Sequence, residues 1–337
     1  MRNLTIFGCG ELGGKLYFEF QREQELFDRF YLIGRDLEKP NSWVSLAKQS
    51  FRKTYDTKIY TDARLEKVIS ESTVFVFTAS KNDRFNLEQN TQSNLSIIRK
   101  VAPFFPKNYS GTIIIASNQT DTLCYEFAER SLVNPYRIIG FNGLDYRRAR
   151  NDISIFVDEE IEIKPCIIGP HHNSILLPEK SYVNNRTLDF LLDDYELQMI
   201  NESRNNSARK IIKGLGTTND LAATALRELI QIIINGGEDT VSTIYQHRNQ
   251  RLYTGMPVKF KNQQAIITLE KLNELEQIQF NLILDAFVSE FLEKFDLLKS
   301  ENLSVEQMIQ KAMYTNLPEQ NKLLEQIRNI NQRNIFQ

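Results

Sequence analysis

Histidine, the side chain that exchanges a proton most readily near neutral pH, occurs at only three positions in this chain of 337 residues. They are His171, His172 and His247. A histidine that gives or takes the proton of an alcohol during hydride transfer works best beside a carboxylate that holds its tautomer. Residues 144–150, Leu-Asp-Tyr-Arg-Arg-Ala-Arg, supply such a carboxylate next to arginines that can bind a substrate carboxylate through two parallel hydrogen bonds. These residue types predict acid–base chemistry on a small carboxylic acid.

A glycine-rich loop follows the first expected strand. Residues 8–13, Gly-Cys-Gly-Glu-Leu-Gly, form a GxGxxG pattern between a strand expected at 4–7 and a helix expected at 14–22. The first glycine permits a tight turn, the second lets the backbone approach a pyrophosphate, and the third allows close helix–strand packing. The helix N-terminus supplies N–H groups to the phosphates, although the same pattern also occurs in structural turns that bind nothing. The residues expected to bind a dinucleotide here are Gly8, Gly10, Glu11, Leu12 and Gly13.

The end of the second expected strand bears on the type of dinucleotide. A carboxylate at that position accepts hydrogen bonds from the adenosine ribose hydroxyls and repels a 2′-phosphate. In this chain Gly34 takes the usual acidic position, and the guanidinium of Arg35 follows it. Because a guanidinium pairs well with a phosphate, NADP is slightly favoured. The alternative is that Asp36 reaches the ribose and that the cofactor is NAD.

Short apolar runs alternate with helical patterns before about residue 140, which predicts a parallel sheet covered by helices on both faces. Later strands are shorter and more polar, as at 153–157. In a late helix, Leu275, Ile278, Leu282 and Phe287 recur at helical spacing and predict a buried face, in the core or at a subunit interface. The expected parallel strands are 4–7, 30–33, 73–77, 111–116 and 137–140.

The fold class that these patterns predict is α/β, a Rossmann-type doubly wound parallel sheet followed by an α+β substrate domain. We expect a cofactor-binding domain over 1–141 and a catalytic domain over 142–300. The segment 301–337 is expected to be a helical or partly ordered extension.

Composition narrows the possible partners. Lys and Arg (41) nearly cancel Asp and Glu (43), so no overall positive field exists to bind nucleic acid or an anionic membrane. The three cysteines, Cys9, Cys124 and Cys166, are widely spaced, which disfavours a disulfide framework or a Cys-rich zinc site. No apolar stretch is long enough to span a bilayer, and no signal segment precedes the first strand. These features predict a cytoplasmic protein without a bound metal.

Several segments, taken in order, resemble the lactate/malate dehydrogenase family from residue 1 to about residue 300. The glycine loop is similar to the family's cofactor fingerprint, and residues 117–121, Ser-Asn-Gln-Thr-Asp, resemble its Asn-Pro-Val-Asp segment. Residues 144–150 resemble its Leu-Asp-Ser-Ala-Arg-Phe-Arg segment. Residues 169–174, Gly-Pro-His-His-Asn-Ser, are similar to its Gly-Glu-His-Gly-Asp-Ser segment. Two later segments, 213–218 and 254–258, also have counterparts in the family.

This resemblance implies an oxidoreductase that transfers a hydride between a nicotinamide cofactor and a small 2-hydroxy or 2-keto acid, as a homodimer or homotetramer. It implies that His171 is the acid and base, that Asp145 is its partner and that Arg148 binds the substrate carboxylate. Arg84, in the loop after the third strand, would polarise the reacting carbonyl. The remaining implied contacts are Asn118 with substrate and nicotinamide, Thr217 with substrate, and Thr78 and Ala79 with the cofactor.

Departures from the family pattern keep other functions open. The loop between Ala79 and Arg84 is shorter than usual, and Lys81 is a candidate for the missing substrate-selecting position. One alternative is therefore a catalytically inactive NAD(P)-binding sensor or interaction protein of the same fold. A weaker alternative is an NAD- and metal-dependent glycosidase, which would need a metal pair such as Cys166 and His171.

Overall fold

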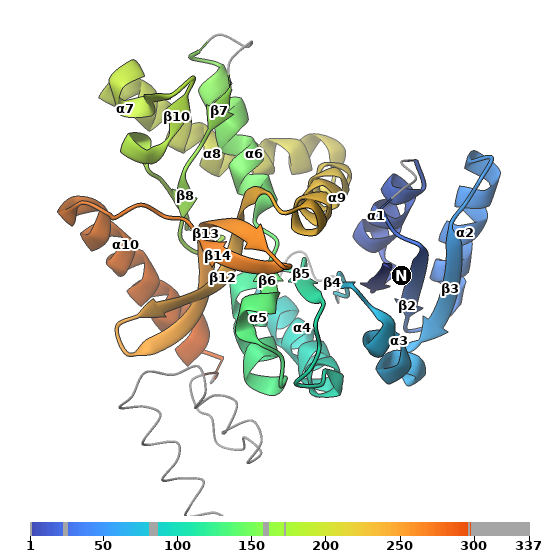
Figure 1. Ribbon diagram of the computed structural model, residues 1–337. Helices are drawn as coiled ribbons and strands as arrows, with labels where there is room; N and C mark the ends of the chain where they lie inside the picture. Colours follow the sequence, from blue (N-terminus) through green and yellow to red (C-terminus); the bar gives the residue numbers. More distant parts are fainter. Residues whose placement is uncertain are drawn as a thin grey trace, which may run out of the picture.

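The computed structural model describes residues 2–22, 26–80, 87–157, 162–171, 173–295 and 297. A nine-stranded sheet has the order β14-β13-β12-β6-β5-β4-β1-β2-β3 (Figure 1). Strands β6 to β3 in that order are parallel, and β12 to β14 extend the sheet in antiparallel fashion. The parallel strands are β1 (Asn3–Phe7), β2 (Arg29–Gly34), β3 (Asp56–Thr61), β4 (Val74–Phe77), β5 (Thr112–Ile115) and β6 (Ile138–Gly140).

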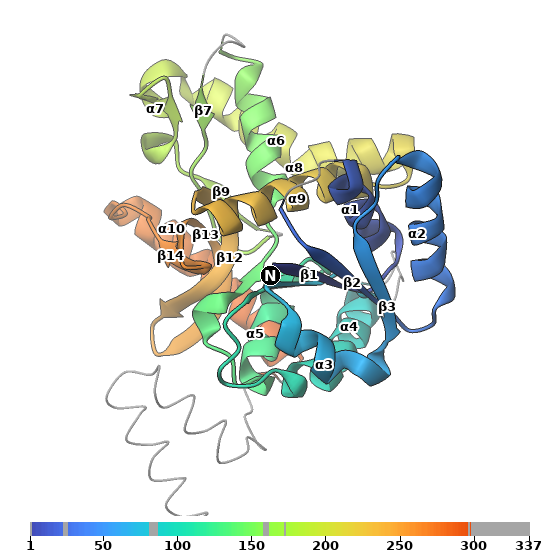
Figure 2. The ribbon, with the colours of Figure 1, turned by 45° about the vertical axis from the view of Figure 1, so that its right-hand side comes forward.

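Helices cover both faces of the parallel strands, which explains why β1, β4 and β5 are buried along their whole length. Figure 2 shows α1 and α2 on one face and α3, α4 and α5 on the other. Helix α1 follows the glycine loop and buries Leu16, Tyr17 and Phe20 against the sheet. This arrangement confirms the predicted α/β fold with its doubly wound parallel sheet. The helices are α1 (Glu11–Arg22), α2 (Glu38–Ser50), α3 (Leu65–Glu71), α4 (Leu87–Val101) and α5 (Thr120–Arg130).

The order of the parallel strands reverses between β1 and β4. Strand β1 pairs with β2 on one side and with β4 on the other, so their carboxyl ends open a crevice at this switch point. In open α/β sheets, ligands bind in that crevice. The fold therefore places the glycine loop, which follows Phe7, at the usual ligand position of such sheets.

The second half of the chain adds helices and small sheets. A separate apolar cluster forms around α6, where Ala149 and Ile153 pack with Ile163, Leu188 and Ile200. The helices are α6 (Gly143–Ser154), α7 (Leu188–Leu191), α8 (Asp194–Leu215), α9 (Asn219–Asn235) and α10 (Glu274–Phe287), which continues as a π-helix over Val288–Glu293. The strands are β7 (Ile163–Lys164), β8 (Ile167–Ile168), β9 (Ile175–Leu176), β10 (Tyr182–Val183), β11 (Arg186–Thr187), β12 (Glu238–His247), β13 (Gln250–Lys261) and β14 (Gln264–Ile267).

One expectation about the second half is wrong, and for a second the structure excludes the core but leaves the subunit interface as a prediction. The strand expected at 153–157 does not form, because Ile153 and Ser154 complete helix α6 and Ile153 packs into the second apolar cluster. The stripe of Leu275, Ile278 and Leu282 is not buried within the chain, since these side chains are 72%, 50% and 64% exposed. Helix α10 instead buries the opposite face, through Phe280, Leu284 and Phe287.

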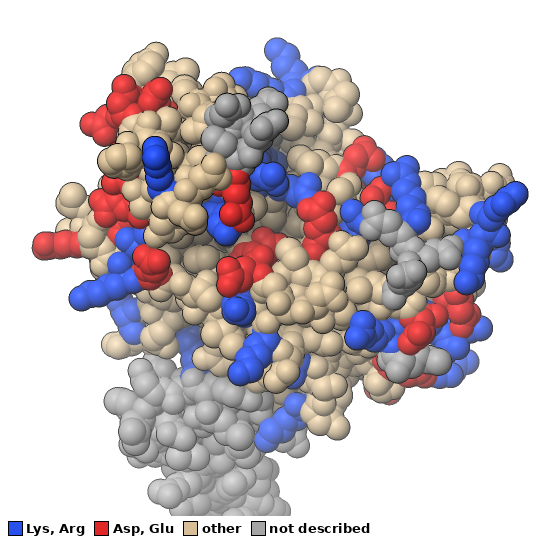
Figure 3. All heavy atoms as spheres, turned by 45° about the horizontal axis from the view of Figure 1, so that its top comes forward, with Lys and Arg blue, Asp and Glu red and all other residues tan. Residues whose placement is uncertain are grey.

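Surface charge is mixed. On the face shown in Figure 3, Lys and Arg side chains are interspersed with Asp and Glu, in keeping with a net charge of -2. Among the residues that the structure describes, no helix combines the length and the apolar character needed to cross a membrane. The proposed boundary between residues 141 and 142 stays a prediction.

Candidate active site

A cavity of about 1160 Å³ opens at the carboxyl ends of β1, β2 and β4. Its size suits a dinucleotide together with a small substrate, since pockets for drug-sized ligands span roughly 300–1,000 Å³. The predicted residues that line it are Gly8, Gly10, Glu11, Leu12, Gly34, Arg35, Thr78, Ala79, Asn118, His171 and Thr217. The structure therefore brings most of the expected cofactor residues and His171 to one cavity, whereas Gly13, Asp145 and Arg148 are not among its lining residues.

The glycine loop has the geometry of a phosphate cradle. Gly8 has a φ of 105°, and a side chain there would collide with the backbone of Ala79. Gly13 lies behind the loop, where a Cβ would collide with the carbonyl of Gly8 and approach Thr78 Oγ1 to 2.6 Å. A Cβ at Gly10 would meet nothing within 4 Å, so that this position is open toward a ligand. The loop and the N-terminus of α1 thus fit a dinucleotide pyrophosphate.

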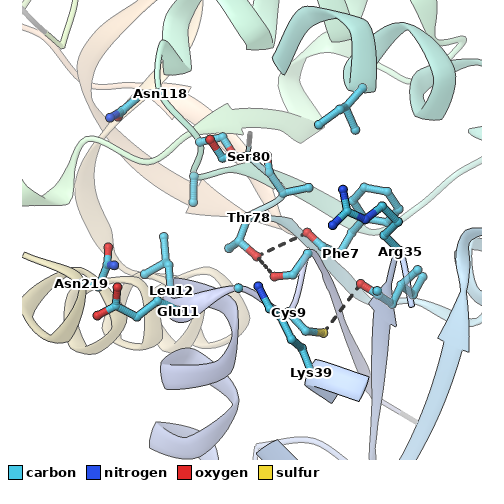
Figure 4. Close-up of a pocket in the computed structure, with 18 of the residues that line it drawn as sticks. Phe7, Cys9, Glu11, Leu12, Arg35, Lys39, Thr78, Ser80, Asn118 and Asn219 are labelled. Atoms are coloured by element: carbon cyan, nitrogen blue, oxygen red, sulfur yellow. Dashed lines mark hydrogen bonds between the residues drawn. The ribbon is translucent and has the colours of Figure 1, made fainter. Parts of the chain in front are cut away.

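The side chains that line the cavity mark two opposite ends. In Figure 4, Arg35 and Lys39 lie on the side of β2, whereas Asn118 and Asn219, the first residue of α9, lie on the far side. A Cβ at Gly34 would stand 2.5 Å from the carbonyl oxygen of Asp36 and 2.9 Å from the ring of Pro40. No acidic side chain fits at position 34 in this backbone. This end, which we call the cationic end after Arg35 and Lys39 although Asp36 and Asp62 also line it, is therefore the candidate site for the adenosine half.

The predicted acid–base residues meet where His171 lines the cavity, and this part is therefore the candidate nicotinamide end. Asp145 and Arg148 are three residues apart on α6 and share one helix face. Asp145 Oδ2 lies 2.7 Å from His171 Nδ1, and Asp145 Oδ1 accepts a hydrogen bond from Arg148 Nη1 at 3.1 Å. These side chains are only 10% to 16% exposed. The three residues that the sequence singled out thus form one contiguous network.

Burial and charge oppose each other in this network. Burial alone would raise the pKa of Asp145, but the adjacent His171 outweighs it, with help from Arg148, and the pKa of the carboxyl falls below its ordinary value. Burial likewise disfavours a charged His171, yet the Asp145 carboxylate wins, and the pKa of His171 rises above its ordinary value. The Asp145 carboxylate therefore stabilises the protonated imidazole relative to an ordinary histidine.

The loop that carries His171 is tied to the extended sheet. Gly169 and Gly255 exchange two backbone hydrogen bonds of 3.0 Å, which fasten the loop to β13. A Cβ at Gly255 would lie 2.6 Å from the carbonyl oxygen of Gly169, so that only glycine allows this approach. Thr217 follows the C-terminal glycine of α8, and its hydroxyl accepts a hydrogen bond from the backbone of Asn219 at 3.1 Å.

Three of the predicted candidates, Arg84, Lys81 and His172, lie outside the described residues. His247 pairs with Asp285 at 2.8 Å, on α10. Among the described residues, no group of three or more His, Cys, Asp and Glu side chains has an arrangement that would hold a metal ion, so Cys166 and His171 form no such group.

Sequence reasoning missed several residues that the structure brings in. Lys39 lines the cavity beside Arg35, and its position at the start of the following helix was the only available signal. Asn219 lines the far end at the start of α9. Asp121 and Ser242 bond each other behind His171, although 121 residues separate them, and nothing in the sequence indicates that contact.

Known proteins resemble this chain in sequence over part of its length. No protein-family model matches the chain. The malate dehydrogenase of Thermomicrobium roseum is 26% identical over 182 residues, which cover 49% of this chain and 57% of that protein. Malate dehydrogenase 2 of Aquifex aeolicus is 27% identical over 177 residues, which cover 49% of this chain and 51% of that protein. The matches thus span little more than half the length of these curated relatives.

Solved structures extend the likeness to nearly the whole chain. Malate dehydrogenase from Plasmodium falciparum has a TM-score of 0.77 at 20% identity and covers 89% of this chain and 100% of that one. Lactate dehydrogenase from Eimeria maxima with NADH and oxamate has a TM-score of 0.75 at 18% identity, over 90% and 97%. The fold is thus that of the malate and lactate dehydrogenases. The partial sequence matches, also to malate dehydrogenases, point in the same direction.

Proposed function

We propose that this protein is a nicotinamide-dependent dehydrogenase that interconverts a small 2-hydroxy acid and the corresponding 2-keto acid. The observation that carries the proposal is the network of Asp145, His171 and Arg148, whose imidazole opens into the cavity of the glycine loop. The lactate dehydrogenase of Eimeria maxima, which has a similar fold, was solved with NADH and oxamate. A nicotinamide cofactor and a small acid bound to that protein support the same chemistry here.

In this mechanism a bound nicotinamide supplies or accepts the hydride at the substrate carbon. His171 gives its proton to the carbonyl oxygen during reduction and takes the hydroxyl proton during oxidation. Asp145 accepts a hydrogen bond from Nδ1–H, so that Nε2 faces the substrate. Its negative charge also stabilises the imidazolium that is present before reduction. Arg148 already contacts Asp145 through Nη1, and we assign the rest of its fork to the substrate carboxylate.

Three further residues complete the proposed site. Asn118 orients the substrate and nicotinamide from the loop before α5, and Thr217 borders the pocket just after α8. Arg84 is assigned to the reacting carbonyl, where a cation stabilises developing negative charge. That role rests on the family resemblance, since Arg84 lies outside the described residues.

The cofactor we propose is NADP in preference to NAD. The crowding at Gly34 excludes the acidic side chain that would select a ribose hydroxyl, and Arg35 and Lys39 put two cations at that end of the cavity. Asp36 is already engaged, because its Oδ1 accepts a hydrogen bond from the backbone N–H of Glu38 at 3.1 Å. A 2′-phosphate therefore has more partners here than a ribose diol.

A homo-oligomer is the proposed assembly, as a dimer or tetramer. The exposed side chains of Leu275, Ile278 and Leu282 on α10 support this, because an exposed apolar stripe at helical spacing suits a protein interface. Sedimentation of the full chain tests it directly, and a sedimenting species of monomer mass at micromolar concentration contradicts it.

One experiment tests function and cofactor together. Pyruvate, oxaloacetate and branched 2-keto acids are each combined with NADH and NADPH, and loss of the reduced-nicotinamide absorbance is followed. We expect oxidation with at least one keto acid and faster turnover with NADPH. Cofactor binding without oxidation across the panel would instead support an inactive binding protein.

A further inference from the structure

Asp121 is a buried carboxylate that has no part in the mechanism above, yet it contacts the loop of the proposed acid. It is the second residue of α5 and is 3% exposed. Its Oδ2 accepts a hydrogen bond from the backbone N–H of His171 at 2.9 Å, and its Oδ1 accepts one from the Ser242 hydroxyl at 2.6 Å. A buried carboxylate needs such partners, and these two fix its orientation.

Three elements meet at this carboxylate. Ser242 is fully buried in β12 and stands opposite Gly140 at the end of β6. A Cβ at Gly140 would lie 2.7 Å from Ser242 Cβ and 2.6 Å from Thr120 Cγ2, so that the glycine lets β12 and α5 come this close. Asp121 consequently joins helix α5, strand β12 and the histidine loop.

We propose that Asp121, held by Ser242, is a positioning residue that fixes the backbone of His171 relative to both Asp145 and the nicotinamide end of the cavity. The same turn of chain carries Asn118, three residues earlier, which lines the cofactor cavity. One short segment, 118–121, therefore links the group that lines the cofactor cavity to the group that holds the histidine loop. The inference rests on the proposed dehydrogenase function.

The charge of Asp121 also acts on His171. The charged groups around His171 are Asp145 and Arg148 from α6 and Asp121 from α5, while Arg204 from α8 faces Asp145. Burial lowers the pKa of His171, Asp145 raises it most, Asp121 raises it further and Arg148 opposes both. Removal of the Asp121 charge should therefore move the titration of His171 to lower pH.

The test compares D121N with D152N in the full-length chain. Asn keeps the shape of Asp and an acceptor oxygen but removes the charge. Asp152 is a matched control because it is also 3% exposed and also accepts a hydrogen bond from a serine, Ser203, at 3.0 Å. Each protein is labelled at histidine ¹³Cε1 and titrated by NMR, with the three histidine signals assigned from H171A, H172A and H247A.

We expect D121N to lower the His171 midpoint by roughly 0.5 to 1 pH unit. We also expect it to lower kcat/KM for keto-acid reduction about tenfold with cofactor affinity unchanged. D152N should leave the His171 midpoint where it is. An unchanged midpoint in D121N, or an equal shift in D152N, overturns the proposal.

S242A keeps the test decisive if D121N does not fold, as judged by circular dichroism. It removes one hydrogen bond from Asp121, and we expect kcat to fall about threefold at constant cofactor affinity. An unchanged kcat in S242A overturns the proposal. If the wild-type chain reduces no keto acid, the proposed function fails, whereas the NMR titration still decides whether Asp121 acts on His171.

Discussion

The glycine loop and the surroundings of His171 use different parts of the chain to form the cavity. At the glycine loop the important atoms belong to the backbone, and Gly8, Gly10 and Gly13 serve by lacking side chains. Around His171 the important atoms belong to side chains from separate elements, with Asp121 on α5 and Asp145 on α6. The glycine loop works by letting a phosphate approach the backbone closely. The site around His171 works through buried charges of opposite sign and hydrogen bonds.

This difference separates binding from chemistry. A change in the glycine loop alters how near a phosphate can come, which should appear in cofactor affinity. A change in the side-chain network alters proton transfer or substrate orientation, which should appear in kcat or in KM for the acid. Substitutions in the glycine loop that change only cofactor affinity, and substitutions around His171 that change only kcat or KM, would support this separation.

The largest effect is expected for His171→Ala. Loss of the proton-transfer group should lower kcat about 10³-fold, while the dissociation constant of NADPH changes less than about twofold. Steady-state rates and quenching of protein fluorescence by the cofactor measure the two quantities. His247→Gln is the control, because His247 pairs with Asp285 away from the cavity. Wild-type turnover in His171→Ala would show that another group moves the proton.

Arg148→Lys should act on the substrate rather than the cofactor. Lysine keeps the charge but loses the fork that binds a carboxylate at two points. The expected loss of about 2 kcal/mol raises KM for the keto acid about 30-fold. Arg150→Lys, at an exposed position on the same helix, provides the matched control. An equal rise of KM in both variants would remove the assigned role from Arg148.

Replacement of Gly10 by alanine should weaken cofactor binding, whereas replacement of Gly13 should lower stability. Gly10→Ala meets no protein atom within 4 Å, so the melting temperature should hold while the dissociation constant of the cofactor rises about 30-fold. Gly13→Ala collides with Gly8 and should lower the free energy of unfolding by about 3 kcal/mol. Calorimetry without cofactor measures the stabilities. A destabilised Gly10→Ala with normal affinity would mean that Gly10 faces protein and not ligand.

The same division explains what sequence could predict. The glycine loop and the end of β2 are local patterns, so residue types at fixed spacing located Gly8, Gly34 and Arg35. The family resemblance brought together Asp145 and His171, which lie 26 residues apart. Contacts that arise only when distant elements pack have no local signal. Asp121 with Ser242 is such a contact, at a separation of 121 residues.

Periodicity failed where it was ambiguous. Ile153 and Ser154 alternate like a strand, but α6 continues through them because its inner face packs against α8 and the second apolar cluster. On α10, apolar residues recur at helical spacing on two faces. Phe280 and Leu284 face the core, whereas Leu275 and Leu282 face outward. Spacing alone does not tell which face a protein buries within one chain.

The smallest effects should arise at the cationic end, where the side chains of Arg35 and Lys39 are exposed. Arg35→Ala should raise the dissociation constant of NADPH about tenfold, through loss of a charge-assisted pair with the 2′-phosphate. Lys39→Ala should raise it about threefold, the value of an exposed ion pair. Neither should change NADH affinity. Lys48→Ala, in the last turn of the same helix, should change neither cofactor. If NADH binds more tightly than NADPH and Asp36→Ala weakens it, the ribose partner is Asp36, and the cofactor is NAD.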